Sequence, residues 1–209
     1  IISSELNTGF GFLLTNSQIK AKGLLDVYGN SVGIQADNSK VVFENLCADA
    51  HSNEAIKARN SLFIFDSPAS PQSAGQSDRK QLDMSANGQH INLLNNSTFT
   101  IERKNNMPTT YGNCKFQTAH GVIKWGGVNK FSLPAISVDD GSNLDLIHAD
   151  LRLDGLDESV EEVPCYGRGI RATNNSKVSL FGTGSGCTFV FGPAGLTYQQ
   201  KMVGLYANN

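Results

Sequence analysis

The sequence is poor in charge and has no cluster of basic residues. Only 17% of its 209 residues are Asp, Glu, Lys or Arg, the formal net charge is -2 at pH 7, and the pI is near 6.1. A groove that follows a phosphate backbone needs clustered Lys and Arg side chains. We therefore expect no nucleic-acid partner.

Long apolar runs are also missing. The longest, such as residues 10–14, fall far short of the roughly 18 apolar residues that a membrane helix needs. The first residues show no charged segment followed by an apolar one, so they do not match an export signal. The sequence predicts no membrane span.

Cysteine is scarce and widely spaced, with single residues at Cys47, Cys114, Cys165 and Cys187. No pair has C-x-x-C spacing and none lies at ligand spacing from a histidine, so we expect no bound metal and no cofactor. Two disulfides would allow three connectivities, but buried thiols are favoured in a chain of this length.

Turn-forming residues are abundant instead. Glycine accounts for 21 residues, and Asn and Ser are about as frequent. This composition suits many short strands joined by turns. All-β domains commonly reach this length as one unit, so we expect a single domain over residues 1–209.

One short phrase recurs along the chain. The segment GIQADNSKVVF at 33–43 returns as AIKARNSLFIF at 55–65 and as GIRATNNSKVSL at 169–180. Apolar residues alternate on both sides of each polar centre, which is the period of a strand with one buried face. The polar centres of these copies contain no Asn-Gly hairpin signal, so two strands are expected to meet at a corner. A seventh copy of the phrase runs to the end of the chain. In the first six copies the corner carries a marker serine: Ser17, Ser39, Ser61, Ser97, Ser142 and Ser176.

The spacing of these marker serines predicts a solenoid. The shortest spacing, from Ser17 to Ser39 and from Ser39 to Ser61, is 22 residues. That length holds about three strands of four or five residues, enough for one turn whose strands stack in parallel at ~4.8 Å. Residues 24–30 would supply the third strand of the first turn. Longer turns carry their extra residues at one position, which predicts loops on one side at about 66–88, 102–134 and 148–168.

The residue before each marker serine is expected to adopt a left-handed conformation, which Asn tolerates best among non-glycine residues. Gly141 takes this place in one copy. Stacked copies would align the asparagines in a ladder whose amides hydrogen-bond along the axis. The predicted ladder residues are Asn16, Asn38, Asn60, Asn96 and Asn175.

This pattern resembles the right-handed parallel β-helix, or pectin-lyase-like, superfamily, in which a sharp two-strand corner with an Asn ladder recurs in each coil. The resemblance covers roughly residues 10–209. It implies an all-β, right-handed parallel β-helix (solenoid) of about six to seven coils with loop insertions on one side. The superfamily includes polysaccharide lyases and hydrolases, phage tailspikes and other virion proteins, and secreted adhesins.

An incomplete catalytic set keeps an enzyme open as the alternative. Asp139-Asp140 is similar to the paired carboxylates of pectin-hydrolysing members, where one acts as general acid and the other activates water. Those enzymes also carry Gly-His-Gly and Arg-x-Lys later in the chain, whereas here His120 precedes the pair and Arg168 lacks the lysine. If the protein is a polysaccharide lyase or glycoside hydrolase, these four residues are the catalytic candidates. We favour the interpretation that Asp139 and Asp140 form a polar corner.

Aromatic residues in the second long loop are the candidate binding residues. Trp125, the only tryptophan, lies near Tyr111, His120 and Phe131 in the sequence. Such side chains can form a platform for a sugar ring or a partner surface. Burial as a local core beneath the loop is the favoured alternative.

The expected function follows from a rod without terminal caps. A solenoid without capping coils exposes strand edges, so we expect a segment of a longer chain whose ends meet other domains or subunits, with a homotrimer as one such assembly. The predicted role is a non-catalytic structural or recognition element. Phage virion proteins (tail, baseplate or tailspike) and surface adhesins fit best, which places the protein in the virion, or secreted or at the cell surface. A cell-surface polysaccharide is the expected ligand.

Overall fold

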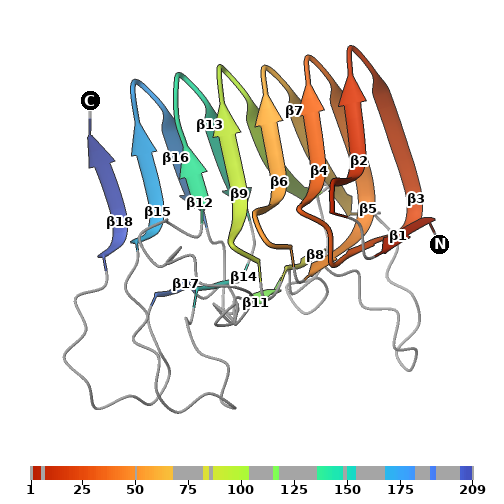
Figure 1. The fold of residues 1–209 in the computed structure, drawn as a ribbon. Coiled ribbons are helices and arrows are strands. Elements are labelled where there is room, and N and C mark those ends of the chain that lie inside the picture. The colour runs from red at the N-terminus through yellow and green to blue at the C-terminus, as the bar shows by residue number, and fades with distance from the viewer. Residues whose placement is uncertain are drawn as a thin grey trace.

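The protein is built from parallel β-strands (Figure 1). Every regular element of the described residues is a strand, and every strand pair is parallel. That part of the chain holds no helix with the length and apolarity that a membrane crossing requires. The computed structural model describes residues 2–5, 8–49, 51–67, 82–84, 87–103, 115–117, 136–147, 150–153, 168–181, 189–191 and 203–208.

Seven strands form the front sheet of Figure 1, and each is the first strand of a copy of the repeated phrase. Neighbours in this sheet are neighbours in the repeat, so the sheet grows by one strand per turn of the chain. In spatial order the strands are β2 (Phe10–Thr15), β4 (Val32–Asp37), β6 (Glu54–Arg59), β9 (Gln89–Leu94), β12 (Ile136–Val138), β15 (Arg168–Thr173) and β18 (Val203–Asn208).

Eight strands form the back sheet, which receives the chain after each corner. The order repeats that of the front sheet, because each front strand from β2 to β15 is followed at once by a back strand. The strands are β1 (Ile2–Glu5), β3 (Gln18–Tyr28), β5 (Lys40–Asp49), β7 (Leu62–Ser67), β10 (Thr98–Arg103), β13 (Asn143–Ile147) and β16 (Lys177–Phe181), with β8 (Leu82–Asp83) beside β5.

The third strand expected in each turn is continuous with the second in the first two turns. Strands β3 and β5 run through both positions, and their pairing shifts register between Ala21 and Leu24, beside Gly23 at φ 82°. The first half of β5 pairs with β7 and its second half with β8. A bulge therefore joins the second and third strand positions in these turns. Further along, a separate three-stranded sheet consists of β11 (Lys115–Gln117), β14 (Asp150–Leu153) and β17 (Phe189–Phe191).

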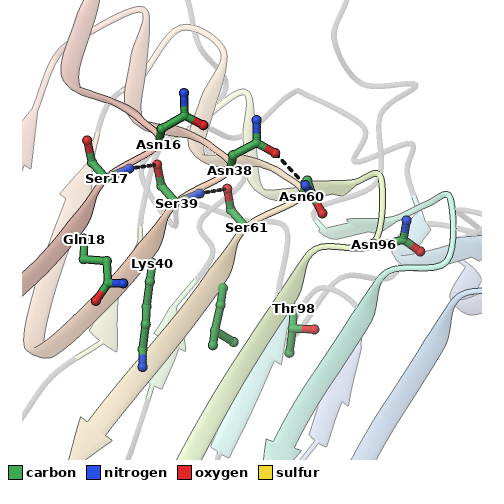
Figure 2. A pocket seen from close by; sticks show the side chains of 11 residues that line it. Asn16, Ser17, Gln18, Asn38, Ser39, Lys40, Asn60, Ser61, Asn96 and Thr98 are labelled. Atoms are coloured by element: carbon green, nitrogen blue, oxygen red, sulfur yellow. Dashed lines mark hydrogen bonds between the residues drawn. The ribbon is translucent and has the colours of Figure 1, made fainter.

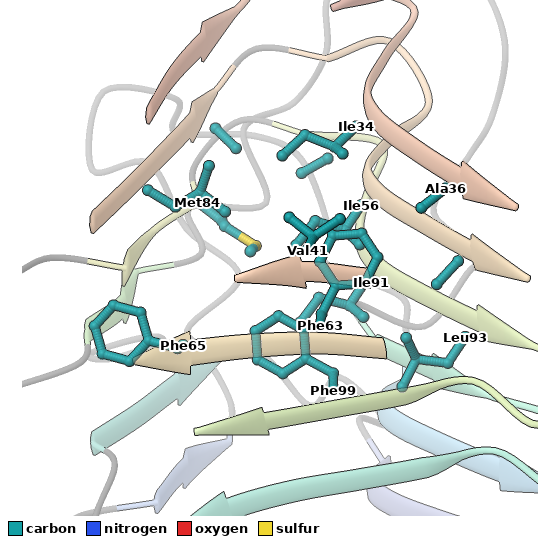
Figure 3. Close-up of a cluster of buried hydrophobic side chains, with 14 of the residues drawn as sticks. Ile34, Ala36, Val41, Ile56, Phe63, Phe65, Met84, Ile91, Leu93 and Phe99 are labelled. Carbon is teal, nitrogen blue, oxygen red and sulfur yellow. The ribbon is translucent and has the colours of Figure 1, made fainter. Parts of the chain in front are cut away.

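The inward faces of the sheets form one apolar cluster (Figure 3). On the front sheet one isoleucine per turn lies over the next, in register from Ile34 to Ile170. On the back sheet the Phe43 and Phe65 rings lie 5.6 Å apart, and Phe63 and Phe99 lie 6.3 Å apart, so the rings join neighbouring turns. Each buried Phe contributes about 1.5–3 kcal/mol, and each ring pair adds about 0.5–1.5 kcal/mol.

The expected fold class is confirmed at the level of an all-β protein with parallel sheets. The strand register stacks each copy of the phrase on the copy before it, as the repeat predicts. This arrangement is compatible with a parallel β-helix. Because the copies are stacked, side chains that occupy the same place in successive copies form a row across the sheet.

Candidate functional site

The corner between the front and back sheets has the backbone conformation that the sequence predicts. The residue before each marker serine has a positive φ, which non-glycine residues rarely adopt. Asparagine and glycine tolerate this conformation best, which explains their alternation at the position. The φ values are 49° at Asn16, 50° at Asn38, 47° at Asn60, 60° at Asn96, 72° at Gly141 and 60° at Asn175.

The marker serines form a hydrogen-bonded row along the corner. From the second copy onward, each serine hydroxyl accepts a hydrogen bond from the backbone N–H of the marker serine one turn earlier. The N–Oγ distance is 3.0 Å from Ser17 to Ser39 and from Ser39 to Ser61, and 3.1 Å at each of the three later steps. We call these residues the serine row: Ser17, Ser39, Ser61, Ser97, Ser142 and Ser176.

Most serine hydroxyls in the row also donate within their own corner. The Ser39 hydroxyl donates to the carbonyl of Asp37 at 2.8 Å, and that of Ser61 donates to the carbonyl of Arg59 at 2.7 Å. Ser39, Ser61, Ser97 and Ser142 are buried, so each bond is made away from water. Each of these hydroxyls thus accepts a bond from a backbone N–H of the preceding turn and donates a bond to a carbonyl of its own turn.

The asparagine amides lie outside the serine row and face solvent (Figure 2). Asn60 donates its amide N–H to the side-chain oxygen of Asn38, which joins two neighbouring turns. The amide of Asn16 makes no hydrogen bond to any residue within the described ranges. The serine hydroxyls, and not the amides, therefore form the row of side-chain bonds that runs through the corner.

A shallow groove of about 540 Å³ runs along this corner. Ser17, Ser39 and Ser61 of the serine row line its centre. Exposed amides line one side, and the first residues of the back strands line the other (Figure 2). We call it the corner groove; besides Ser17, Ser39 and Ser61 it is lined by Asn16, Asn38, Asn60, Asn96, Gln18, Lys40, Leu62 and Thr98.

The Asp139–Asp140 pair occupies the fifth corner, and protein groups bind both carboxylates. Asp139 is buried, accepts a hydrogen bond from the Thr173 hydroxyl, and forms an ion pair with Arg171, whose Nη2 lies 2.6 Å from Oδ2. Asp140 is exposed at φ 57° and accepts a bond from the Asn174 amide at 3.0 Å. Both acids thus join their corner to the next one.

The side chains of the remaining candidate residues fall outside what the structure describes. His120, Tyr111, Trp125 and Phe131 lie outside the described residues. Arg168 begins β15, and only its backbone is described. The catalytic and aromatic sets therefore stay predictions from the sequence.

A second polar row, absent from the sequence-based expectations, lies at the turn before the front strands. The backbone N–H of Asn30 donates to Nδ1 of His51 at 3.1 Å, and the N–H of His51 donates to the Asn87 side-chain oxygen at 3.0 Å. All three residues are buried. Their spacing along the chain follows the repeat, but their residue types differ, so no recurring letter marks them.

Burial lowers the pKa of His51. Desolvation disfavours the charged imidazolium and outweighs the backbone bonds to Asn30 and Val27 and the nearby Asp49, which raise the pKa. Nδ1 lies 3.1 Å from the Asn30 nitrogen and 3.3 Å from the Asn30 carbonyl oxygen, so the ring tautomer decides whether Nδ1 accepts or donates, while Nε2 lies at the other edge of the ring. Gly33 leaves room for this edge of the ring, since a Cβ there would come within 2.6 Å of Nε2.

No metal-binding group of three or more His, Cys, Asp and Glu side chains occurs in the described part of the chain. The half-buried thiol of Cys47 donates to the Asp49 carboxylate at 3.2 Å. Cys114, Cys165 and Cys187 fall outside the described residues.

Comparison with protein-family models, curated proteins and solved structures finds no match to this chain. A functional assignment therefore depends on the residues of the chain itself and on their geometry.

Proposed function

We propose that the chain is a right-handed parallel β-helix of about six to seven coils that serves as a non-catalytic structural and recognition element. A virion component (tail, baseplate or tailspike) or a surface adhesin is the role that fits it best. In this role the chain would contact other domains or subunits of a larger assembly, with a homotrimer as one such assembly.

The observation that carries this proposal is the serine row. At five successive steps a serine hydroxyl, which belongs to a buried residue at four of them, joins two turns of the chain, alongside the backbone bonds of two sheets. Buried, satisfied polar groups hold one register, because any slip would leave donors unpaired. A stack held in this way is stiff along its axis and presents the same side chains at every turn. Those properties suit a rod that supports or displays other groups.

The surroundings of Asp139 also favour a structural role. A general acid or base must keep an oxygen directed at the substrate. Both oxygens of Asp139 are bound by protein groups, one by the Thr173 hydroxyl and the other by Arg171. The Asp139–Asp140 pair therefore resembles the other polar corners more than a pair of hydrolytic carboxylates.

The rival function, degradation of a polysaccharide, is separated by a turnover assay. The purified chain and its Asp139→Asn and Asp140→Asn variants are incubated with uronate polymers and neutral polysaccharides, and products are sized by mass spectrometry. We expect no products from any of them. Cleavage by the wild-type chain that is lost in the variants would contradict the non-catalytic proposal.

Location is tested with antibodies against the chain. Immunogold labelling of virus particles would support the virion role, and labelling of the cell surface would support the adhesin role. Labelling confined to the cell interior, in a cell that produces no particles, would contradict both.

A further inference from the structure

The corner groove combines a regular spacing with unused hydrogen-bonding groups on the protein surface. It extends over four turns, from Asn16 to Asn96, and each turn contributes an exposed amide. We propose that this groove binds an extended oligosaccharide chain of about four sugars, laid along the axis of the stack. The inference rests on the recognition role proposed above and gives that role a site.

The spacing of the amides suits a glycan. Equivalent residues of successive turns are parallel-strand neighbours, about 4.8 Å apart. In an extended β-1,4-linked chain each pyranose advances by nearly the same length. One sugar can therefore lie opposite each turn. Successive sugars of such a chain are turned over relative to one another, so equivalent hydroxyl groups meet the same side chains at every second turn.

The chemistry of the lining also suits hydroxyl groups. A side-chain amide offers both a donor and an acceptor, and sugar hydroxyls need both. Asn60 donates one amide N–H to the side-chain oxygen of Asn38. The N–H₂ group of Asn38 and the side-chain oxygen of Asn60 are left for a ligand. On the other side of the groove, Leu62 can contact the apolar edge of a ring while Gln18 and Thr98 supply further polar groups.

The charge of the groove limits the class of glycan. Its lining contains one cation, Lys40, and no acidic side chain. A neutral chain is accepted, and a chain with an occasional carboxylate gains from Lys40. A single cation is too little for a nucleic-acid backbone, whose binding depends on several neutralised phosphates.

An extended peptide fits less well. Side chains on one face of a strand repeat about every 6.6–6.8 Å, so a peptide laid along the groove would fall out of step with the amides within two turns. The groove therefore favours sugars over peptides on geometry and over nucleic acids on charge.

The first experiment is a length series measured by calorimetry on the full chain. Cello-oligosaccharides of two to six sugars are titrated, together with uronate oligosaccharides of the same lengths. Affinity is expected to rise with length and to stop rising at about four sugars, because the groove spans four turns. No binding of either series up to millimolar concentration would overturn the proposal.

Matched variants then place the site. Asn38→Gly combined with Asn60→Gly removes two amides and keeps the left-handed backbone, as Gly141 does in its own corner. Two lost hydrogen bonds are expected to lower affinity by about tenfold or more. Asn175→Gly is the control, since Asn175 has the same conformation and lies outside the groove; its affinity should stay within about twofold of wild type. Equal binding by the double variant would overturn the proposal.

The charge is tested separately with Lys40→Gln. This variant should weaken binding of the uronate series and leave the neutral series unchanged, while Lys177→Gln, in the same cross-strand row but outside the groove, should change neither. A loss confined to Lys177→Gln would overturn the placement.

These outcomes are independent of the turnover assay. Absent binding would remove the proposed ligand and leave a structural rod, whereas turnover would contradict the non-catalytic role even if the groove bound sugars.

Discussion

The Ser61 hydroxyl accepts a hydrogen bond from the backbone N–H of Ser39, 22 residues earlier in the chain, at 3.0 Å. This bond is buried and is repeated along the corner with the same partners one turn on. It links the backbone of one corner to the serine side chain of the next corner. A single hydroxyl therefore contributes to the stacking of turns as well as to the shape of its own bend.

Replacing Ser61 with alanine should destabilise the fold. The change removes the acceptor for the Ser39 N–H and leaves that donor buried without a partner, which costs about 1–3 kcal/mol in the free energy of unfolding. Urea denaturation followed by circular dichroism measures the loss.

Ser17→Ala is the matched control for Ser61→Ala. Ser17 is half-buried, and its hydroxyl donates to Thr15, but no backbone N–H of the described residues donates to it. Its replacement should cost no more than about 1 kcal/mol. Equal losses at the two positions would show that the bond between turns adds nothing.

The sequence predicts the stacking of turns and the left-handed corners, because both follow from a short phrase with fixed period and a position that only Asn, Asp or Gly fills easily. It does not identify the residue that carries the bonds. The expected amide ladder has its Asn60–Asn38 bond in the described residues, whereas serine bonds join neighbouring turns at five steps. The available signal was that serine is present in all six copies while the preceding residue varies.

The second polar row was missed for a physical reason. Asn30, His51 and Asn87 share one task, accepting or donating a backbone bond in a buried turn, and side chains of different type can do it. A search for repeated letters therefore passes over them. The sequence predicts the position of the third strand, which is the second half of β3. It does not predict the bulge after Ala21 that joins the two halves of β3, because this bulge has no distinct sequence pattern.

The two acids of the fifth corner should respond differently to neutralisation. Asp139→Asn removes the charge that Arg171 pairs with, and because the arginine is partly exposed we expect a loss of only about 1 kcal/mol, reduced further by salt. Asp140→Asn should change stability by less than about 0.5 kcal/mol, since asparagine adopts the same conformation at Asn95 and Asn174. Thermal unfolding at low and high salt measures both. A larger loss at Asp140 than at Asp139 would contradict this assignment.

Two glycines should differ sharply when each is changed to asparagine. A Cβ at Gly33 would lie 2.5 Å from the Ala55 carbonyl oxygen and 2.6 Å from His51, so Gly33→Asn should cost about 3 kcal/mol or more. Gly23 has open space around its Cβ position and φ 82°, which asparagine tolerates, so Gly23→Asn should cost less than about 1 kcal/mol. Chemical denaturation of both variants tests the difference. Similar losses would show that backbone conformation, and not crowding, decides the result.

Stability should fall in mild acid because of His51. Its pKa in the fold lies below the value of 6.5 expected when unfolded, so the neutral ring stabilises the fold above that pH and the contribution is lost as pH falls below it. His51→Asn keeps an acceptor for the Asn30 N–H, as Asn87 does for His51, but cannot take up a proton. Unfolding free energies measured from about pH 7.5 to pH 5 should decline by up to about 1.4 kcal/mol per pH unit more in the wild type than in the variant. Parallel pH profiles would mean that His51 keeps its ordinary pKa in the folded protein.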